Sequence, residues 1–440
     1  MPRLTAAWQL AEFAHSLRLE NIPKDVRALA WTCLVDAVGC ASFGSKFPWS
    51  HMIIDQALVG GSTGPCHLPT FSLSGLPAEQ AALIAGVCAH AFELDSLRKP
   101  GAGVHPGATV ALPALLVAQE VGADLDDLLC AITAGIEVMF RIGNATLHSA
   151  EQRGFHAPGI TGPFGAAVAT GLLRGLSVEQ LVAAFGISGS MGGGLLAFSQ
   201  GAGGMVKRLH MGRAAQAGVV AASLAARGFE GPETVLEGKF GLLDAYCPNS
   251  DPSRLTSQLS EVWEIRTLCL KRYACHVTAQ APIECLREIM VEHEFNGCEI
   301  QSVELAVSAK VLSHHSNPNP TDLAGAQYSV PYSFAVATLN DPENPQAFID
   351  ALESKQARDL ASKIVLRQAS PSQDKWGAEL TIKLISGKIF HAQKETFRGT
   401  PETPFSPENL ARKFETLTGV PLFMNEVDPV SAWLKPYHTR

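Results

Sequence analysis

The chain has 440 residues, a net charge of −8 and an isoelectric point near 6.0. This length is about two to three times that of a typical domain, so we expect two domains or one large domain with an elaboration. A hydrophobic fraction of 46% against 17% charged residues excludes a disordered or fibrous chain. The acidic balance lacks the basic excess that a nucleic-acid-binding protein usually carries.

Helical periodicity dominates roughly the first 260 residues. Apolar side chains recur at helical spacing in the runs that open at Pro77 and at Leu125, and proline suits a first helical turn. Residues 162–173 and 212–227 are rich in alanine and glycine and nearly free of charge, which is typical of helices buried on most faces. No run with the alternation of a strand stands out in this part of the chain.

The pattern changes after residue 264. Residues 303–307 alternate between apolar and polar or small side chains, as in a half-buried strand. Residues 380–384 alternate in the same way, and Ser386-Gly387 then predicts the turn of a hairpin. Residues 407–417 have a helical pattern again.

We therefore expect a mainly α protein with a large all-helical domain and a smaller α+β lid domain. The helical domain is discontinuous and consists of residues 1–264 and 396–440. Residues 265–395 form the lid domain. Both ends of the chain then contribute to the same domain.

The sequence gives no positive sign of a membrane, a secretion signal or a disulfide framework. Its ten cysteines are scattered singly without a C-x-x-C pair, so neither disulfides nor a structural zinc site are expected. Glu12 and His15 interrupt the N-terminal segment, which has no signal-peptide core. Uninterrupted apolar stretches such as residues 110–118 are far short of the ~20 residues that span a bilayer. We expect a cytoplasmic protein.

Residues 90–107 are the segment richest in candidate chemistry. Glu93 and Asp95 leave a helix, a Gly/Pro loop follows, and His105 lies at the mouth of the next apolar helix. Polar groups at such a junction either cap the helices or line a cleft. The two carboxylates could orient a catalytic histidine, or they could pair with the basic residues 98–99 of the loop.

A second histidine, His156, is held in another Gly/Pro loop just before a helix of small residues. The N-terminus of a helix favours anions through its free N–H groups and its dipole, so a polycarboxylate would suit this position. The alternative is a histidine whose ring nitrogens are satisfied by backbone carbonyl groups.

Two basic doublets, Lys207-Arg208 and Lys271-Arg272, are each followed by a histidine a few residues later, His210 and His276. Converging cations bind carboxylates, arginine through two parallel hydrogen bonds and lysine as a point charge. For each arginine taken alone, a solvated surface is the favoured interpretation.

Three other patterns are rejected as functional motifs. Glycines 189–194 follow a helical pattern and lack both G-x-G-x-x-G and the G-K-[ST] ending of a phosphate loop. The neighbouring His314 and His315 point apart, so no metal site is expected there. No G-x-S-x-G motif of a serine hydrolase occurs.

Taken together and in order, the candidate motifs resemble the MmgE/PrpD family over about residues 6–420. That family includes 2-methylcitrate dehydratases, cis-aconitate decarboxylases and iminodisuccinate epimerases. The resemblance implies a helical domain from both chain ends, a smaller α+β lid, a homodimer, and no metal or iron–sulfur cluster. It rests on His90-Ala-Phe-Glu93-Leu-Asp95, His105-Pro-Gly, Gly154-Phe-His156, Lys207-Arg208-Leu-His210-Met-Gly-Arg-Ala-Ala and Lys271-Arg272-Tyr-Ala-Cys-His276.

By this resemblance, Glu93 and His105 fall where the decarboxylases of the family place an acid and a catalytic histidine. Further positions match residues of the pocket, namely His156, Lys207, Lys271, His276 and Tyr332. The frequent Asp-Asp-Thr of the family reads Asp95-Ser96-Leu97 here, and the loop before His105 is slightly longer. These departures leave the fold alone but do not allow a named substrate to be transferred.

Dehydration, decarboxylation and epimerisation of such acids all create carbanion character next to a carboxylate. We predict that His105 and His156 exchange the proton, because the reference pKa of histidine suits both acid and base at neutral pH. Three groups are predicted to hold carboxylates and spread the developing charge: Lys207, Lys271 and His276. Glu93 and Asp95 are predicted to orient a nearby histidine.

The predicted function is a cofactor-free lyase that acts on a di- or tricarboxylic acid, of the 2-methylcitrate dehydratase type. A cis-aconitate-type decarboxylase and an iminodisuccinate-type epimerase are the alternatives within the family. A non-catalytic carboxylate-binding protein is the alternative from another class. No cofactor, nucleic-acid partner or membrane partner is expected.

Overall fold

The computed structural model describes residues 5–59, 61, 63–68, 71–101, 103–200, 203–370 and 375–422. The chain divides into two compact units. The helical unit comprises Met1–Ala91, Asp95–Cys269 and Pro407–Arg440, and the α+β unit comprises Phe92–Leu94 and Leu270–Ser406. The predicted boundaries, after residues 264 and 395, thus lie before those of the units, after 269 and 406. The part of the predicted helical domain beyond residue 422 lies outside the described residues.

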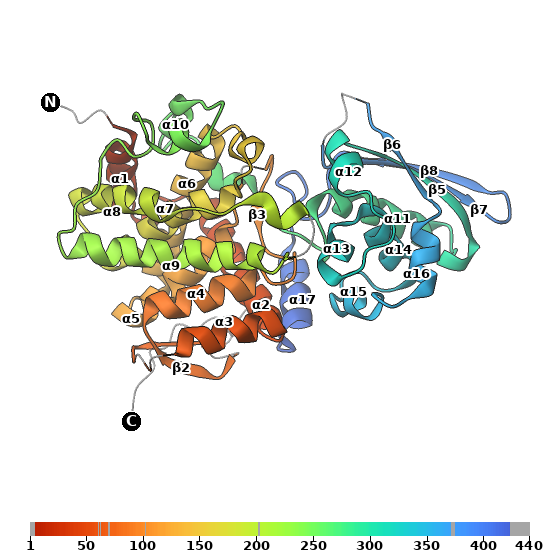
Figure 1. Cartoon of the computed structure of the whole chain (residues 1–440), viewed down its shortest axis with the longest axis horizontal. Coiled ribbons are helices and arrows are strands. Elements are labelled where there is room, and N and C mark those ends of the chain that lie inside the picture. The colour runs from red at the N-terminus through yellow and green to blue at the C-terminus, as the bar shows by residue number, and fades with distance from the viewer. Residues whose placement is uncertain are drawn as a thin grey trace. The chain divides into compact units, whose positions relative to one another are not determined.

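Two long helices rich in small residues, α7 and α9, pack against each other in the helical unit, with α4 on α9 and α6 on α7 (Figure 1). A Cβ atom added to Gly218 of α9 would lie 2.2 Å from the Cβ of Ala166 in α7, so the helices approach at a distance that only glycine allows. The α-helices of the helical unit are α1 (Ala6–Ser16), α2 (Lys24–Gly44), α3 (Pro48–Leu58), α4 (Ala78–Ala89), α5 (Leu112–Val121), α6 (Leu125–Ala145), α7 (Ala157–Leu173), α8 (Val178–Met191), α9 (Val206–Ala226), α10 (Leu242–Tyr246) and α17 (Pro407–Thr418).

Local sequence sets where several of these helices begin. The carboxylate of Asp124 accepts the N–H of Asp127 and caps α6, and Ser177 forms a reciprocal capping box with Gln180 at the start of α8. At the other end of the chain, α17 packs on α2, and its Lys413 pairs with the buried Asp36 of that helix. This pair ties the returning C-terminal segment to the helical unit.

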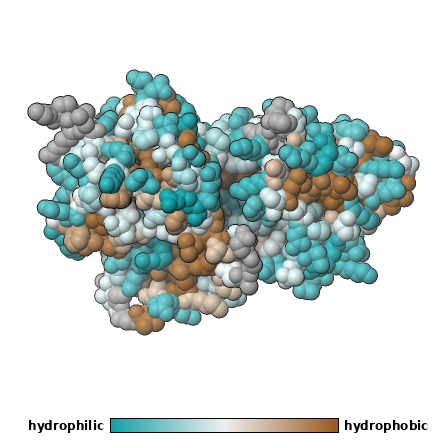
Figure 2. Space-filling model, turned by 45° about the horizontal axis from the view of Figure 1, so that its top comes forward, coloured by the Kyte–Doolittle hydropathy of each residue, from teal (hydrophilic) through white to brown (hydrophobic). Residues whose placement is uncertain are grey.

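Two helices are longer than we expected from the short uninterrupted apolar stretches of the sequence. α2 and α6 have 21 residues each and are long and apolar enough to cross a membrane by length and composition. In the most apolar 18-residue window of each helix, 72% of α2 and 83% of α6 is buried inside the protein, as in the core helices of soluble proteins. On the face drawn in Figure 2, hydrophilic side chains cover most of the surface and apolar side chains gather in separate patches.

A four-stranded sheet in the order β6-β5-β7-β8 forms part of the α+β unit. β5 pairs parallel with β6 and antiparallel with β7, and Gly387 turns β7 into β8 with a φ of 86°. α11 packs against β7 and β8. The elements are α11 (Gln280–Glu292), β5 (Ile300–Val307), α12 (Ala309–His314), α13 (Leu323–Tyr328), α14 (Val330–Leu339), α15 (Gln346–Asp350), α16 (Lys355–Ala361), β6 (Ile364–Gln368), β7 (Ala378–Leu384) and β8 (Ile389–Lys394).

The predicted fold class, a large helical domain with a smaller α+β domain, is confirmed. The alternating runs correspond to β5 and to the β7–β8 hairpin. Four short strands of the helical unit did not stand out in the sequence because two to four residues are too few to show a period: β1 (Cys66–Leu68), β2 (Leu73–Leu76), β3 (Leu97–Arg98) and β4 (Leu268–Cys269). The role of the α+β domain as a lid stays a prediction.

Candidate active site

A buried carboxylate shared by two histidines lies at the C-terminal end of α4, in the helical unit. His90 caps that helix, and its Nδ1 lies 3.0 Å from both carboxylate oxygens of Asp95. Nδ1 of His105, ten residues further along, lies 3.0 Å from one of the same oxygens. The rings of the two histidines meet edge to face at 4.5 Å. The prediction that a carboxylate orients a catalytic histidine therefore has a geometric counterpart in Asp95.

The backbone fixes which nitrogen of His105 carries the hydrogen. Its Nδ1 also lies 3.0 Å from the carbonyl oxygen of Ser96, and a carbonyl can only accept a hydrogen bond. Nδ1 is therefore the donor, and the neutral ring keeps its lone pair on Nε2. Burial alone would raise the pKa of Asp95, but the contacts of His90 and His105 hold that pKa well below its usual range. Asp95 thus stays ionised and faces two N–H donors.

The two histidines around Asp95 differ in exposure. Burial lowers the pKa of His90 well below its ordinary value against the opposing charge of Asp95, and the charge of Lys207 lowers it further. The ring of His90 is therefore neutral at pH 7. The side chain of His105 exposes 13% of its surface to solvent, whereas the side chain of His90 exposes none. Of the two rings, His105 is therefore the one with access to a proton from outside.

His90, Asp95 and His105 each offer one atom that could ligate a metal, and these atoms lie within 4.8 Å of one another, close enough to share one cation. The sequence spacing did not reveal this convergence. Both histidines contact Asp95 at 3.0 Å, the length of an ordinary hydrogen bond. Nδ1 of His105 also faces the carbonyl oxygen of Ser96, where a metal ligand would need a lone pair. The expected absence of a metal at the site stays a prediction.

His156 is the N-cap residue of α7, as its Gly/Pro loop suggested, and its ring meets a second histidine. Nδ1 of His156 lies 3.0 Å from Nδ1 of His210 on α9. The carbonyl oxygen of Gly194 accepts the backbone N–H of His156 at 3.0 Å. A Cβ atom on Gly194 would lie 3.0 Å from Nδ1 of His210, so the glycine loop can close over this pair only without a side chain.

The first basic doublet divides into two roles. Lys207 is buried in the first turn of α9, and its charge lowers the pKa values of His90 and His210, although burial is the largest cause for both. Nε of Arg208 donates to the carbonyl oxygen of Ala91 at 2.9 Å, and its guanidinium lies 4.2 Å from the ring of Trp49. Lys207 therefore lies among the histidines, and Arg208 holds the end of α4.

Glu93 and Lys271 form a buried ion pair within the α+β unit. Nζ of Lys271 lies 3.2 Å from Oε2 and 3.2 Å from the backbone carbonyl oxygen of Glu93. Glu93 has a φ of 55°, a left-handed conformation that is uncommon for a residue with a side chain and is frequent at functional sites. Glu93 thus pairs with Lys271, which was predicted to bind a substrate carboxylate. In the loop, the guanidinium of Arg98 instead contacts Glu264 at 2.6 Å.

His276 lies in a cluster of rings within the α+β unit. Its ring stacks on that of His315 at 4.0 Å, and the ring of Tyr328 lies 5.3 Å away. Nδ1 of His276 lies 2.9 Å from the hydroxyl oxygen of Thr278 and accepts the backbone N–H of the same residue at 3.4 Å. Because that N–H points at Nδ1 and the hydroxyl can donate as well, the neutral ring carries its hydrogen on Nε2. Sequence reasoning missed His315 and Tyr328, because only the fold brings them to His276.

The structure buries Tyr332 in the core instead of the cluster around His276. Its hydroxyl donates to the carbonyl oxygen of Ala351 at 2.5 Å, and its side chain is inaccessible. α14 is apolar on nearly every face, so a tyrosine in it must find a backbone acceptor inside the protein. The role of Tyr332 as a pocket residue stays a prediction, and Tyr328 is the tyrosine that lies beside His276.

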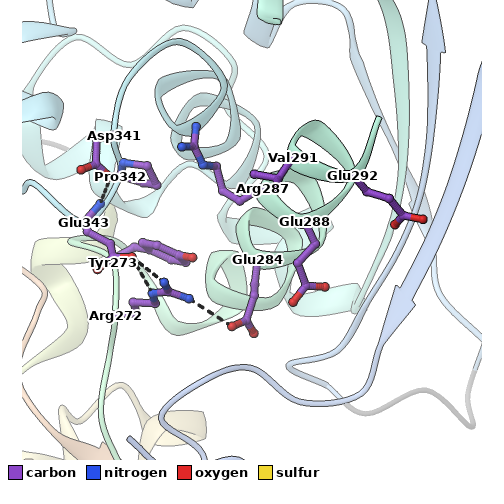
Figure 3. A pocket seen from close by; sticks show the side chains of 10 residues that line it. All are labelled: Arg272, Tyr273, Glu284, Arg287, Glu288, Val291, Glu292, Asp341, Pro342 and Glu343. Carbon is purple, nitrogen blue, oxygen red and sulfur yellow. Dashed lines mark hydrogen bonds and ion pairs between the residues drawn. The ribbon is translucent and has the colours of Figure 1, made fainter. Parts of the chain in front are cut away.

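A cavity of about 420 Å³ opens beside α11 of the α+β unit (Figure 3). Arg272 lies on its wall between Glu284 and Glu343 and pairs with both. None of the residues predicted to be catalytic lines this cavity. The second doublet therefore divides as the first does, with Arg272 in a charged surface cavity and Lys271 in a buried pair.

Two family descriptions match nearly the whole chain: the MmgE/PrpD N-terminal domain over residues 8–255 and the MmgE/PrpD C-terminal domain over residues 273–426. The chain belongs to the MmgE/PrpD family. Both the predicted family and, at the level of that family, the predicted lyase class are confirmed.

Several relatives carry one activity in their names. The cis-aconitate decarboxylase of Aspergillus terreus is 28% identical, with 93% of this chain and 89% of the relative covered. The cis-aconitate decarboxylase of Mus musculus is 26% identical over 92% and 85% of the two chains, and that of Homo sapiens is 26% identical over 91% and 85%. These relatives match the decarboxylase alternative of the sequence analysis.

Proposed function

We propose that this protein is a cofactor-free carboxy-lyase that removes CO₂ from a small tricarboxylate of the cis-aconitate kind, as a cytoplasmic homodimer. The observation that carries the proposal is the contact of Nδ1 of His105 with ionised Asp95, which leaves Nε2 as the nitrogen that can exchange a proton. The names of the relatives favour decarboxylation over the dehydration that the sequence suggested first.

The chemistry needs one proton and a place for negative charge. When the bond between carbon and the departing carboxylate breaks, CO₂ leaves and its electron pair stays on the substrate. In an unsaturated acid, this pair moves through the double bond, and the far carbon takes up a proton. An imidazolium at His105 supplies that proton from Nε2, and Asp95 stabilises its positive charge. The cation of Lys207 favours bound carboxylates.

His276 and Lys271 of the α+β unit are proposed as further carboxylate-binding groups. Nε2–H of His276 is a donor in the neutral ring and suits a carboxylate oxygen. Glu93, which pairs with Lys271, is proposed to set the position of that ammonium. His156 is proposed as the second proton-exchanging histidine.

A one-pot proton NMR assay tests the proposal. Citrate, 2-methylcitrate, cis-aconitate and iminodisuccinate are incubated with the protein without added metal. We expect cis-aconitate to disappear with formation of CO₂ and an unsaturated dicarboxylate. Loss of water from 2-methylcitrate would replace the proposal with the dehydratase, and inversion of iminodisuccinate would replace it with the epimerase. Binding without turnover of any acid would support the non-catalytic alternative.

A further inference from the structure

The contact between His156 and His210 carries chemical information beyond its role in packing. Two Nδ1 atoms 3.0 Å apart are at hydrogen-bond distance, and in a neutral pair one must donate and the other must accept. A single hydrogen therefore lies between the rings. If it belongs to His210, the neutral ring of His156 carries its own hydrogen on Nε2; if it belongs to His156, Nε2 has the lone pair.

We propose that His210 is a positioning residue that shares this proton with His156 and relays protons from solvent to it. The shared proton is inferred from the geometry of the two rings. Only the destination of the delivered proton, the substrate, rests on the proposed function.

Exposure gives the relay a direction. His156 is buried with 7% of its surface accessible, whereas His210 is intermediate in exposure. Nε2 of His210 takes a proton from solvent, the shared hydrogen moves from Nδ1 of His210 to Nδ1 of His156, and Nε2 of His156 gives its proton to an acceptor. The pair is then neutral with the shared hydrogen on His156, and both rings turn over before the next proton is delivered. One proton enters at His210, one leaves at His156, and neither ring is left as an anion.

The surroundings hold both rings in place for this transfer. The backbone N–H of His156 donates to Gly194, and its carbonyl oxygen accepts the N–H of Gly159 at 3.0 Å. The ring of Phe198 lies 5.2 Å from that of His156 and 5.9 Å from that of His210. The absence of a side chain at Gly194 leaves room for the ring of His210.

Burial, together with neighbouring charges, lowers the pKa values of both histidines and keeps the pair neutral at pH 7. Burial is the largest cause that lowers the pKa of His156, and His210 and His105 lower it further against the opposing effect of Asp95. Burial also lowers the pKa of His210, with Lys207 as the second cause. A neutral pair can accept and release a proton in turn, whereas a permanently charged pair could not accept one.

The test combines a titration without substrate and an activity measurement. In ¹⁵N NMR of the resting protein, His210→Ala should move the titration of His156 to higher pH, because a ring that disfavours its charge has been removed. The exposed His51 serves as the control through His51→Ala, which should change nothing. If His210→Ala does not fold, the same titration in His210→Asn decides. An unchanged titration of His156 would overturn the shared proton.

Activity separates a relay from a structural contact. His210→Ala and His210→Asn should each lower kcat by roughly 10²-fold, the lower end of the contribution of a positioned acid or base. Added imidazole should restore part of the loss in His210→Ala, because it can carry protons in the space left by the ring. Full activity of His210→Asn would overturn the relay, since an amide does not take up protons at neutral pH. If no acid is turned over but the titration shifts, the proposed function fails and the shared proton stands.

Discussion

His105 of the helical unit and His276 of the α+β unit carry their hydrogens on opposite nitrogens. In His105, Nδ1 meets the carbonyl oxygen of Ser96 and the carboxylate of Asp95, so Nε2 keeps the lone pair. In His276, Nδ1 accepts the backbone N–H of Thr278, so Nε2 carries the hydrogen. The same side chain is thus prepared to exchange a proton at Nε2 in one unit and to donate a hydrogen bond from Nε2 in the other, and the backbone next to each ring makes the difference.

The lysines of the two units differ in a parallel way. Lys207 of the helical unit lies among histidines that burial keeps neutral, and it lowers their pKa values further. Lys271 of the α+β unit has a carboxylate partner, Glu93, at 3.2 Å. We therefore expect the helical unit to exchange protons with the substrate, with Lys207 as a carboxylate-binding cation beside the histidines, and the α+β unit to contribute carboxylate-binding groups alone. Substitutions that affect one of these tasks and spare the other test this division.

The largest expected effect comes from His105→Gln. Glutamine can offer a hydrogen-bonding group near Nε2, but it cannot exchange a proton at neutral pH. We expect kcat to fall by ~10²–10⁴-fold, the usual contribution of a positioned acid or base. His51→Gln, at an exposed position of α3, is the matched control and should retain full activity. A normal kcat in folded His105→Gln would remove His105 from the mechanism.

Lys271→Met is expected to affect stability as well as binding. It leaves the carboxylate of Glu93 buried without this partner, and breaking a buried ion pair costs about 3–5 kcal/mol. The double variant Glu93→Gln/Lys271→Met should recover much of that loss in urea unfolding. Lys383→Met, on an exposed position of β7, is the control. Equal stabilities of the single and double variants would show that the pair is not energetically coupled.

Lys207→Met is the counterpart in the helical unit. A charge-assisted hydrogen bond is worth ~1.5–3 kcal/mol, so KM should rise by roughly 10–150-fold if Lys207 binds a substrate carboxylate. Lys99, in the loop before His105, is buried and cannot serve as a neutral control. A KM unchanged from that of the native enzyme would place the carboxylate-binding cations elsewhere.

The sequence predicted those parts of the site that are close along the chain. Asp95 and His105 are ten residues apart and flank one Gly/Pro loop, so their contact could be anticipated from local pattern. The ring of His210 reaches His156 across 54 residues, and this contact depends on the close approach of α7 and α9 through glycine. Such contacts have no signature in period or spacing.

The different surroundings of Tyr332 and Tyr328 have a similar cause. Both tyrosines lie in one short motif, and α13 ends where α14 begins, at Ser329. The N-cap at that serine turns the chain between them, so Tyr332 enters the core and Tyr328 lies beside His276. A one-residue helix boundary decided which tyrosine joined the cluster, and sequence patterns place such boundaries poorly.

His276→Gln should be much milder than the same change at His105. Because His276 offers an N–H donor at Nε2, the amide of glutamine can replace that group at a similar distance. We expect kcat to be nearly unchanged and KM to rise by less than roughly 10-fold, while His276→Ala loses the hydrogen bond and raises KM more. If His276→Gln were as damaging as His105→Gln, the two histidines would not differ in role.

The buried neutral histidines predict how stability depends on pH. The pKa values of His90 and His156 are lowered in the folded protein, mainly by burial, so the unfolded chain binds more protons as pH falls through about 6.5. Stability should therefore fall on acidification below this pH, by at most about 1.4 kcal/mol per pH unit for each histidine. The contribution of Asp95, whose pKa is also lowered, is lost only below about pH 4.

Urea unfolding of the protein between pH 7 and pH 5 measures this dependence. His156→Gln should reduce the slope because one buried titrating group is removed, and His51→Gln should leave the slope unchanged. A stability that is flat over this range would mean that these rings are protonated in the folded state, and the neutral pair at His156 would be lost with them.

The smallest expected effect is that of chelators, which should leave the activity unchanged. The triangle of His90, Asp95 and His105 is the place where this expectation could fail, since its donor atoms converge within 4.8 Å. With hydrogens on both Nδ1 atoms, the carboxylate of Asp95 is satisfied and a cation would have to displace those protons. Inactivation by EDTA, reversed by one divalent metal and not by others, would therefore mean that Nδ1 of His105 carries a lone pair. The opposite tautomers of His105 and His276 would then disappear, and with them the division of tasks between the two units.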